Sequence, residues 1–147
     1  MIKPKEVEIV NILLKDARLS AREIAAKVGV SVVTVLSKMK ELENQGIIKN
    51  YTADLDYEKL GYDVHAIIRL QITKGKLFEV ENKIAIHPNV FAVYDVTGEF
   101  DALVIAKFKS RKLLDSFLKK IQTYDFVQRT ETQLILNTIK ERNIKVE

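Results

Sequence analysis

The sequence has no cysteine and only two histidines, His65 and His87. Without a thiol the chain cannot form disulfides, thiolate zinc sites or iron–sulfur clusters, and it has no thiol nucleophile. The sequence also lacks an apolar run of roughly 18 residues, the length needed to cross a bilayer. Its first residues lead into charges instead of a signal-peptide core. We therefore expect a protein of the cytoplasm that needs no cofactor, metal ion or membrane.

A strong excess of one charge is also missing, since the formal net charge of the 147 residues is only +4. Residues 1–53 carry nine Lys and Arg against six Asp and Glu, whereas residues 54–147 carry fifteen against fourteen. The small basic excess therefore lies in the shorter amino-terminal part. It permits nucleic-acid binding without establishing it. Hydrophobic residues make up 47 % of the chain, which is ample for packed cores.

Three helices are predicted in the amino-terminal part. The first covers residues 4–16, because a proline opens it and apolar residues recur at helical spacing. Ser20 and Glu23 form a capping box that starts a second helix, which ends at Gly29. Ser31 caps a third helix almost at once, and two helices joined by so short a turn cross steeply, as in a helix-turn-helix. The positions of the third helix predicted to be apolar and inward-facing are Val32, Val35, Leu36, Met39 and Leu42.

Two segments separate this helix-turn-helix from the rest of the chain. Residues 47–53 are rich in β-forming residues and are predicted to be a strand or wing. Residues 54–62 have no clear periodicity and are interpreted as a hinge. The predicted organisation is therefore a winged helix-turn-helix domain over 1–53, a linker over 54–62 and a second domain over 63–147.

Strands and helices alternate in the second domain. Val64 to Ile72 places an apolar residue at every second position, which predicts a strand with one apolar face. The predicted order of elements is βαββαβ, the ferredoxin-like arrangement, so the fold class is α+β. The further elements are a helix over 77–87 that stops before Pro88, strands over 90–96 and 102–108, a helix over 111–124, and a last strand from about Val127 to Ile139.

The exposed face of the third helix carries side chains that suit the major groove of DNA. Val33 offers an apolar contact to a thymine methyl group, and Thr34 and Ser37 have hydroxyls for base edges or phosphates. The alternative is that these are ordinary solvated positions on a three-helix bundle. The full set of candidate DNA-binding residues, which includes phosphate contacts from the second helix and the wing, is Ser20, Arg22, Ser31, Val33, Thr34, Ser37, Lys38, Lys40, Lys49 and Tyr51.

The hairpin between the two middle strands is the candidate effector site. Gly98 permits a backbone shape that leaves N–H groups free to meet a carboxylate, and Asp101 offers an acceptor for an α-ammonium group. Together they suit an amino acid. The alternative is a turn whose glycine and aspartate serve geometry alone. The candidate effector-binding residues are Thr97, Gly98, Glu99, Phe100 and Asp101.

Several sequence runs resemble the leucine-responsive regulator/AsnC family, also called feast/famine regulators. The resemblance covers nearly the whole chain. One departure is Lys38, where the family commonly carries arginine; lysine keeps the charge but loses the bidentate fork. The runs that carry the resemblance are Leu19–Ser31, Thr34-Val35, Leu42-Glu43, Gly46–Ala53, Leu60-Gly61, Thr97–Asp101 and Thr130–Thr132.

The resemblance implies a transcriptional regulator that binds double-stranded DNA at pseudo-palindromic operators. It further implies a winged helix-turn-helix followed by a βαββαβ domain of the RAM type, which dimerises and senses small molecules. Homodimers of such proteins often assemble into octamers, and the hairpin lines an effector cleft between neighbouring dimers.

Two other functions stay open. Some proteins that resemble this family are tetrapyrrole (haem-precursor) decarboxylases, and for that chemistry this chain offers only His65 and Arg69, on one face of the same predicted strand. A ligand-sensing co-regulator that never touches DNA is the other alternative. We expect a DNA-binding regulator, not an enzyme.

Overall fold

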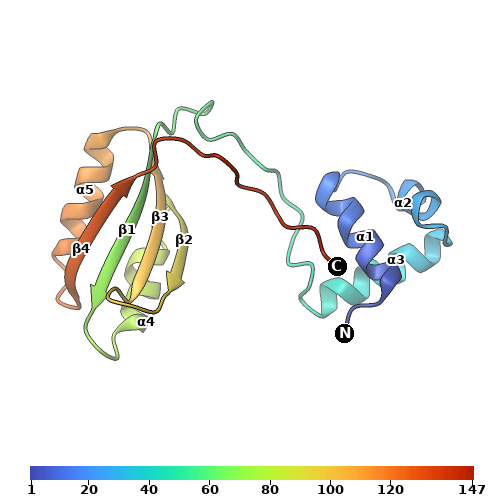
Figure 1. The fold of residues 1–147 in the computed structure, drawn as a ribbon, viewed down its shortest axis with the longest axis horizontal. Coiled ribbons are helices and arrows are strands. Elements are labelled where there is room, and N and C mark those ends of the chain that lie inside the picture. Colours follow the sequence, from blue (N-terminus) through green and yellow to red (C-terminus); the bar gives the residue numbers. More distant parts are fainter. The chain divides into compact units, whose positions relative to one another are not determined.

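The computed structural model describes residues 1–147 as two compact units (Figure 1). One unit combines Met1–Asp54 with Lys140–Glu147, and the other is Leu55–Ile139. The predicted domain limits therefore need correction at the carboxyl end. The last residues join the first unit because the backbone N–H and C=O of Val146 both bond to the Asn11 side chain, at 2.9 and 2.8 Å.

Residues 54–62, expected to be a hinge, mostly belong to the second unit. The Tyr57 ring lies edge-on to Tyr62 and Phe91, with centroids 5.7 and 6.5 Å apart. The ammonium group of Lys107 stands 5.1 Å from the centroid of the Tyr57 ring. These aromatic contacts hold the segment against the second unit.

The first unit is a bundle of three helices, α1 (Pro4–Lys15), α2 (Ala21–Val28) and α3 (Val32–Asn44). Its core contains side chains from all three helices, among them Ile9, Ile24, Val28 and Val35. None of the helices in the chain combines the length and the apolar character needed to span a membrane.

The predicted caps of α2 and α3 are confirmed. The Ser20 hydroxyl accepts the Glu23 N–H at 3.2 Å, and the Glu23 carboxylate accepts the Ser20 N–H at 2.7 Å. Gly29 ends α2 in the left-handed conformation, with φ of 71°. Ser31 accepts the Thr34 N–H at 3.1 Å and so begins α3. The α2–α3 turn is thus determined locally, by two caps and one glycine.

We expect Gly29→Ala to lower the unfolding free energy of the first unit by about 1–2 kcal/mol. A Cβ at this position meets no atom within 4 Å, so the whole effect comes from the left-handed φ. Denaturant titration followed by circular dichroism measures it. Gly29→Asn is the matched control, because asparagine tolerates this conformation better than alanine. Equal losses for both variants would contradict the explanation.

Two predictions for the first unit are wrong. Residues 47–53 were predicted to be a strand or wing, and the strand is wrong, because no strand of the chain pairs with them. Val32 and Leu36, expected in the core, are 37 and 54 % exposed. A bundle of three short helices covers only a narrow stripe of α3, so Val35 and Leu42 are its fully buried positions.

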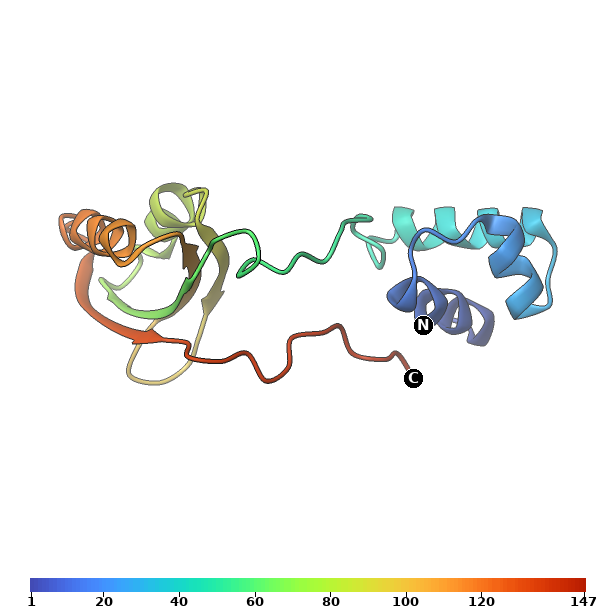
Figure 2. The same cartoon turned by 90° about the horizontal axis from the view of Figure 1, so that it is seen from above.

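The second unit is a four-stranded antiparallel sheet in the order β2-β3-β1-β4. The βαββαβ order and the α+β fold class are confirmed. Figure 2 shows the helices on one face of the curved sheet. In chain order the elements are β1 (Val64–Ile72), α4 (Leu77–Val80), the π-helical η1 (Glu81–Ala85), β2 (Val90–Asp95), β3 (Ala102–Phe108), α5 (Arg111–Gln122) and β4 (Val127–Leu134).

The core of this unit lies between the sheet and its helices. The alternation predicted for β1 is confirmed, since Ala66, Ile68, Leu70 and Ile72 are all buried there. Four elements are shorter than expected: the helices predicted over 77–87 and 111–124 end at Ala85 and Gln122, and the strands predicted over 90–96 and 127–139 end at Asp95 and Leu134. One further backbone hydrogen bond joins β1 and the chain just beyond β4, where the Ile135 N–H donates to the His65 carbonyl at 2.8 Å.

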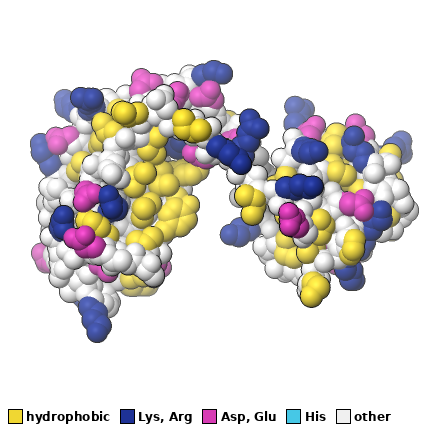
Figure 3. All heavy atoms as spheres, in the orientation of Figure 1, with side chains coloured by type: hydrophobic (Ala, Val, Ile, Leu, Met, Phe, Trp, Pro, Cys, Tyr) yellow, Lys and Arg dark blue, Asp and Glu magenta, His cyan; other side chains and the backbone are white.

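The other side of the sheet carries no helix; we call it the open sheet face. Figure 3 shows apolar side chains gathered on the second unit beside a group of paired charges. Strand alternation places Ile67, Leu103 and Ile105 on this face, and none of the three packs against the core. Lys107 is 8 % exposed on the same face, covered by the Tyr57 and Phe91 rings.

Candidate DNA-binding and effector sites

The outer face of α3 presents a row of free side chains. Val33 is 76 % exposed, and Ser37 and Lys40 are exposed at the helical spacings that follow it. Neither Ser37 nor Lys40 bonds to another side chain within the chain. Leu36, also exposed, adds an apolar side chain that the sequence interpretation had assigned to the core. An exposed helix face with short polar, apolar and cationic groups fits major-groove recognition.

The candidate hydroxyls at the helix starts are already engaged. Ser20 donates to the Glu23 carboxylate at 2.8 Å while it caps α2. The Ser31 and Thr34 hydroxyls lie 2.8 Å apart at the start of α3. Arg22, in contrast, is exposed and forms no ion pair.

Lys38, predicted to contact a phosphate or a guanine, is engaged within the bundle. Its ammonium group lies 3.3 Å from a Glu6 oxygen, and the two side chains are 19 and 8 % exposed. Glu6 also accepts the Lys3 N–H at 2.7 Å, which completes a capping box for α1. The pair thus ties α3 to the start of α1.

We expect the stability of the first unit to depend on pH through Glu6. The Lys3 N–H donor, and then Lys38, hold the pKa of Glu6 below its ordinary value against an opposing effect of burial. Because the pKa of Glu6 is lower in the folded than in the unfolded state, the Glu6 carboxylate stabilises the fold fully above the unfolded pKa. This stabilisation is lost as pH falls through the folded pKa. The unfolding free energy of Glu6→Gln should therefore decrease less than that of wild type as pH falls through this range. Denaturant titrations across this range test it, with exposed Glu8→Gln as the control that should behave as wild type.

Lys49 and Tyr51 follow α3. Lys49 is exposed and forms no ion pair. The Tyr51 hydroxyl donates to Glu43 at 2.8 Å, and burial together with this carboxylate raises the pKa of Tyr51 to about 12. Tyr51 therefore fastens the segment after α3 to the end of that helix, whereas the Lys49 side chain is free.

The predicted effector hairpin connects β2 and β3. Gly98 has φ of 110°, and the N–H groups of Thr97, Gly98 and Glu99 donate no hydrogen bond within the chain. The Asp101 carboxylate, in contrast, accepts the Ile72 N–H at 2.7 Å through one oxygen. The hairpin thus offers free donors for a carboxylate and leaves one Asp101 oxygen for a cation.

Two arginines that the sequence interpretation did not assign to this site flank the hairpin. Phe100 is 6 % exposed, and the guanidinium carbons of Arg69 and Arg129 lie 5.3 and 5.2 Å from its ring centroid. Arg129 donates to Glu99 at 2.8 Å, and Arg69 donates to Glu131. The alternation of β1 and β4 could have shown that Arg69, Arg129 and Glu131 share the open sheet face.

His87, one of the two histidines, is half-buried in the second unit. Burial, followed by the nearby Lys120, lowers its pKa, so the neutral form is favoured. Its Nδ1 accepts the Asn89 N–H at 3.2 Å, and its ring lies 4.7 Å from that of Phe117. His87 is therefore a packing residue beneath the sheet.

Comparison with known proteins agrees with this geometry. Residues 3–49 match the winged helix-turn-helix DNA-binding family, and residues 65–144 match the Lrp/AsnC ligand binding domain. The chain is a DNA-binding transcriptional regulator with a separate ligand-binding domain. It belongs to the Lrp/AsnC family of regulators.

Relatives match over almost their whole length. An HTH-type transcriptional regulator of Pyrococcus abyssi is 42 % identical over 96 % of both chains. The structure of Escherichia coli AsnC is 28 % identical, covers 99 % of each chain and has a TM-score of 0.91. A Neisseria meningitidis transcriptional regulator, solved as a complex with L-Met, is 25 % identical over 100 % of this chain and 97 % of its own, with a TM-score of 0.91.

Proposed function

We propose that the chain reads a pseudo-palindromic operator as a homodimer, with α3 of each copy in the major groove. The observation that carries this proposal is the free row of Val33, Ser37 and Lys40 on α3. Arg22 and Lys49 serve as phosphate contacts on either side. A regulator of this kind acts on the chromosome, hence in the cytoplasm.

Selection of bound sequences from random duplex tests this function. We expect a consensus with two-fold symmetry, because a symmetric dimer presents two copies of the same helix. A consensus without symmetry would contradict the dimeric mode. Failure to enrich any sequence, together with affinity independent of salt, would favour the co-regulator that does not bind DNA.

Lys40→Ala should weaken binding to all duplex sequences alike. A phosphate contact carries no sequence information, and its loss reduces the slope of log affinity against log salt by about 1 per contact. Fluorescence anisotropy at several salt concentrations measures the slope. Lys27→Ala, at an exposed lysine of α2, is the control for loss of charge alone. If Lys40→Ala instead relaxes specificity at one base pair, the lysine reads a base.

The dimer is proposed to form through the open sheet face. Besides its apolar side chains, this face has two buried atoms without hydrogen-bond partners, Nε2 of His65 and Nε of Arg69. Phe91 and Tyr94 are each 52 % exposed on the edge strand beside it. A second copy of the same face would cover the apolar side chains. Such dimers can then assemble into larger oligomers.

The effector is proposed to be an amino acid bound at the hairpin. Its carboxylate would meet the free N–H groups around Gly98, and its ammonium group the second oxygen of Asp101. The L-Met complex of the Neisseria relative supports this ligand class. Titration with L-methionine and the other amino acids, monitored by operator affinity, tests it. Asp101→Asn keeps an acceptor for the Ile72 N–H but removes the charge, so it should abolish the response.

The decarboxylase alternative is not favoured by the positions of its two candidate groups. Arg69 is paired with Glu131 and stacked on Phe100, and His65 is only 7 % exposed. Neither side chain is free to receive a tetrapyrrole carboxylate. We therefore propose that the second unit binds a ligand without transforming it.

A further inference from the structure

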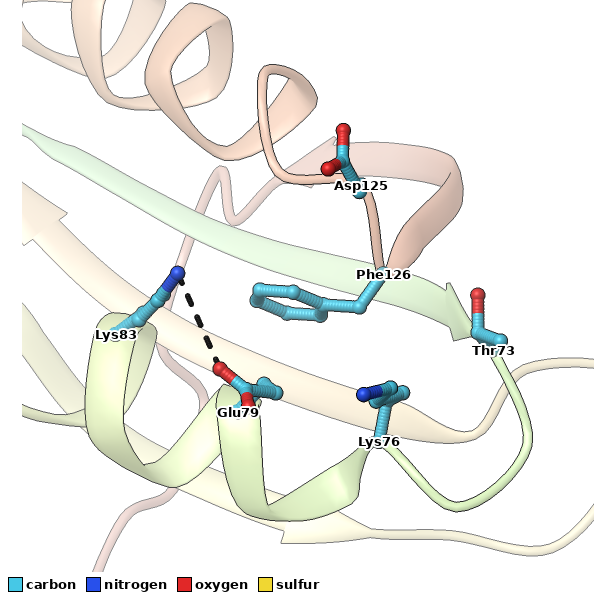
Figure 4. A pocket seen from close by; sticks show the side chains of 6 residues that line it. All are labelled: Thr73, Lys76, Glu79, Lys83, Asp125 and Phe126. Carbon is cyan, nitrogen blue, oxygen red and sulfur yellow. Dashed lines mark ion pairs between the residues drawn. The ribbon is translucent and has the colours of Figure 1, made fainter.

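A pocket of about 270 Å³ lies on the helix side of the second unit (Figure 4). It opens where the end of β1, the start of α4 and the loop before β4 meet. None of the hairpin residues 97–101 lines it. The lining residues are Thr73, Lys76, Glu79, Lys83, Asp125 and Phe126.

The Phe126 ring is the apolar part of this pocket. It is 7 % exposed and stacks on Tyr124, with centroids 5.3 Å apart and planes 11° apart. Its backbone is fixed by the Thr73 N–H, which donates to the Phe126 carbonyl at 2.9 Å. The Lys83 ammonium group lies 5.9 and 5.4 Å from the Phe126 and Tyr124 centroids. The pocket therefore has a rigid aromatic wall beside a cation.

The charged side chains of the pocket are poorly satisfied within the chain. Lys76 and Asp125 take part in no ion pair or side-chain hydrogen bond, and the Thr73 hydroxyl has no partner. The one ion pair of the pocket, Lys83–Glu79, is long at 3.9 Å. Lys83 also belongs to the π-helical η1, a helix form found frequently at functional sites.

The balance of these charges decides the kind of ligand. Two lysines attract a carboxylate, but the two acids nearby repel a multiply charged anion such as phosphate. A simple cation would meet the same conflict with Lys76 and Lys83. A ligand with one carboxylate and one ammonium group satisfies both signs, and the Phe126 ring favours an apolar or aromatic substituent.

We propose that this pocket binds a small zwitterion with an apolar side chain, the chemistry of a free amino acid, independently of the hairpin. The carboxylate contacts Lys76 and Lys83, the ammonium group contacts Glu79, and the side chain packs on Phe126, whereas the Asp125 carboxylate points away from these groups (Figure 4). The inference goes beyond the proposed function, because it gives each subunit a second small-molecule site.

Calorimetric titration of the full chain with L-phenylalanine tests the chemistry. Phenethylamine lacks the carboxylate and 3-phenylpropionate lacks the ammonium group, so each should bind at least about tenfold more weakly. Binding of either analogue as tightly as the amino acid would overturn the zwitterion assignment.

Variants then locate the bound ligand. Lys76→Gln alters an exposed, unpaired side chain and should weaken L-phenylalanine binding about tenfold. Lys112→Gln, on the exposed side of α5, is the matched control and should have no effect. Asp101→Asn separates the two sites, since it should leave this binding unchanged. Loss of binding in Asp101→Asn with full binding in Lys76→Gln would place the ligand at the hairpin and overturn the pocket.

Discussion

Val33→Asp should weaken operator binding at least about 100-fold while the protein stays folded, because the change places a carboxylate against the phosphates and base edges of the groove. Val33 is 76 % exposed, so the substitution removes no core contact. Both the lost apolar contact and the new repulsion weaken the complex. Each factor of ten corresponds to about 1.4 kcal/mol, a size that two such effects readily reach together.

Asn44→Asp is the matched control for this experiment. It adds the same charge to the same helix, but at the exposed carboxyl end of α3, beyond the proposed contact row. Anisotropy should show an affinity close to that of wild type, and circular dichroism should show both variants folded. Equal losses of affinity in the two variants would mean that net charge, and not contact at Val33, governs binding.

The elements that the sequence predicted well are those governed by local chemistry. Ser20, Gly29 and Ser31 set the limits of α2 and α3 through bonds between residues at most five positions apart. The alternation in β1 follows from a sheet with one covered face. Such patterns are visible in a single sequence because the interacting residues are neighbours in it.

The features that the sequence did not show depend on partners far away in the chain. Lys38 looked like a surface cation because Glu6, which pairs with it, lies 32 positions earlier. Arg69 and Arg129 meet the effector hairpin through contacts that cross the sheet, and periodicity does not show which strands are neighbours. The strand predicted over 47–53 had suitable residues but no strand to pair with.

Ile105→Glu should separate the proposed dimer and, through that, weaken operator binding. Ile105 lies on the third strand, opposite Ile67 of the neighbouring strand, in the middle of the open sheet face. Because it does not pack against the core, each subunit should keep its fold. In a dimer, however, the carboxylate would be buried twice across the symmetric interface without a partner, which costs several kcal/mol per charge.

Loss of the proposed dimer should also weaken DNA binding, because a monomer carries only one copy of α3. Two linked recognition helices bind about 10²–10⁴-fold more tightly than one, so a monomer should lose affinity on that scale. Analytical ultracentrifugation measures the assembly, and anisotropy measures the binding. Lys112→Glu, which puts the same charge on the outer side of α5, should leave both unchanged. A folded Ile105→Glu variant that still sediments as a dimer would show that subunits associate through a different surface, and the apolar side chains of the open sheet face would then need another partner.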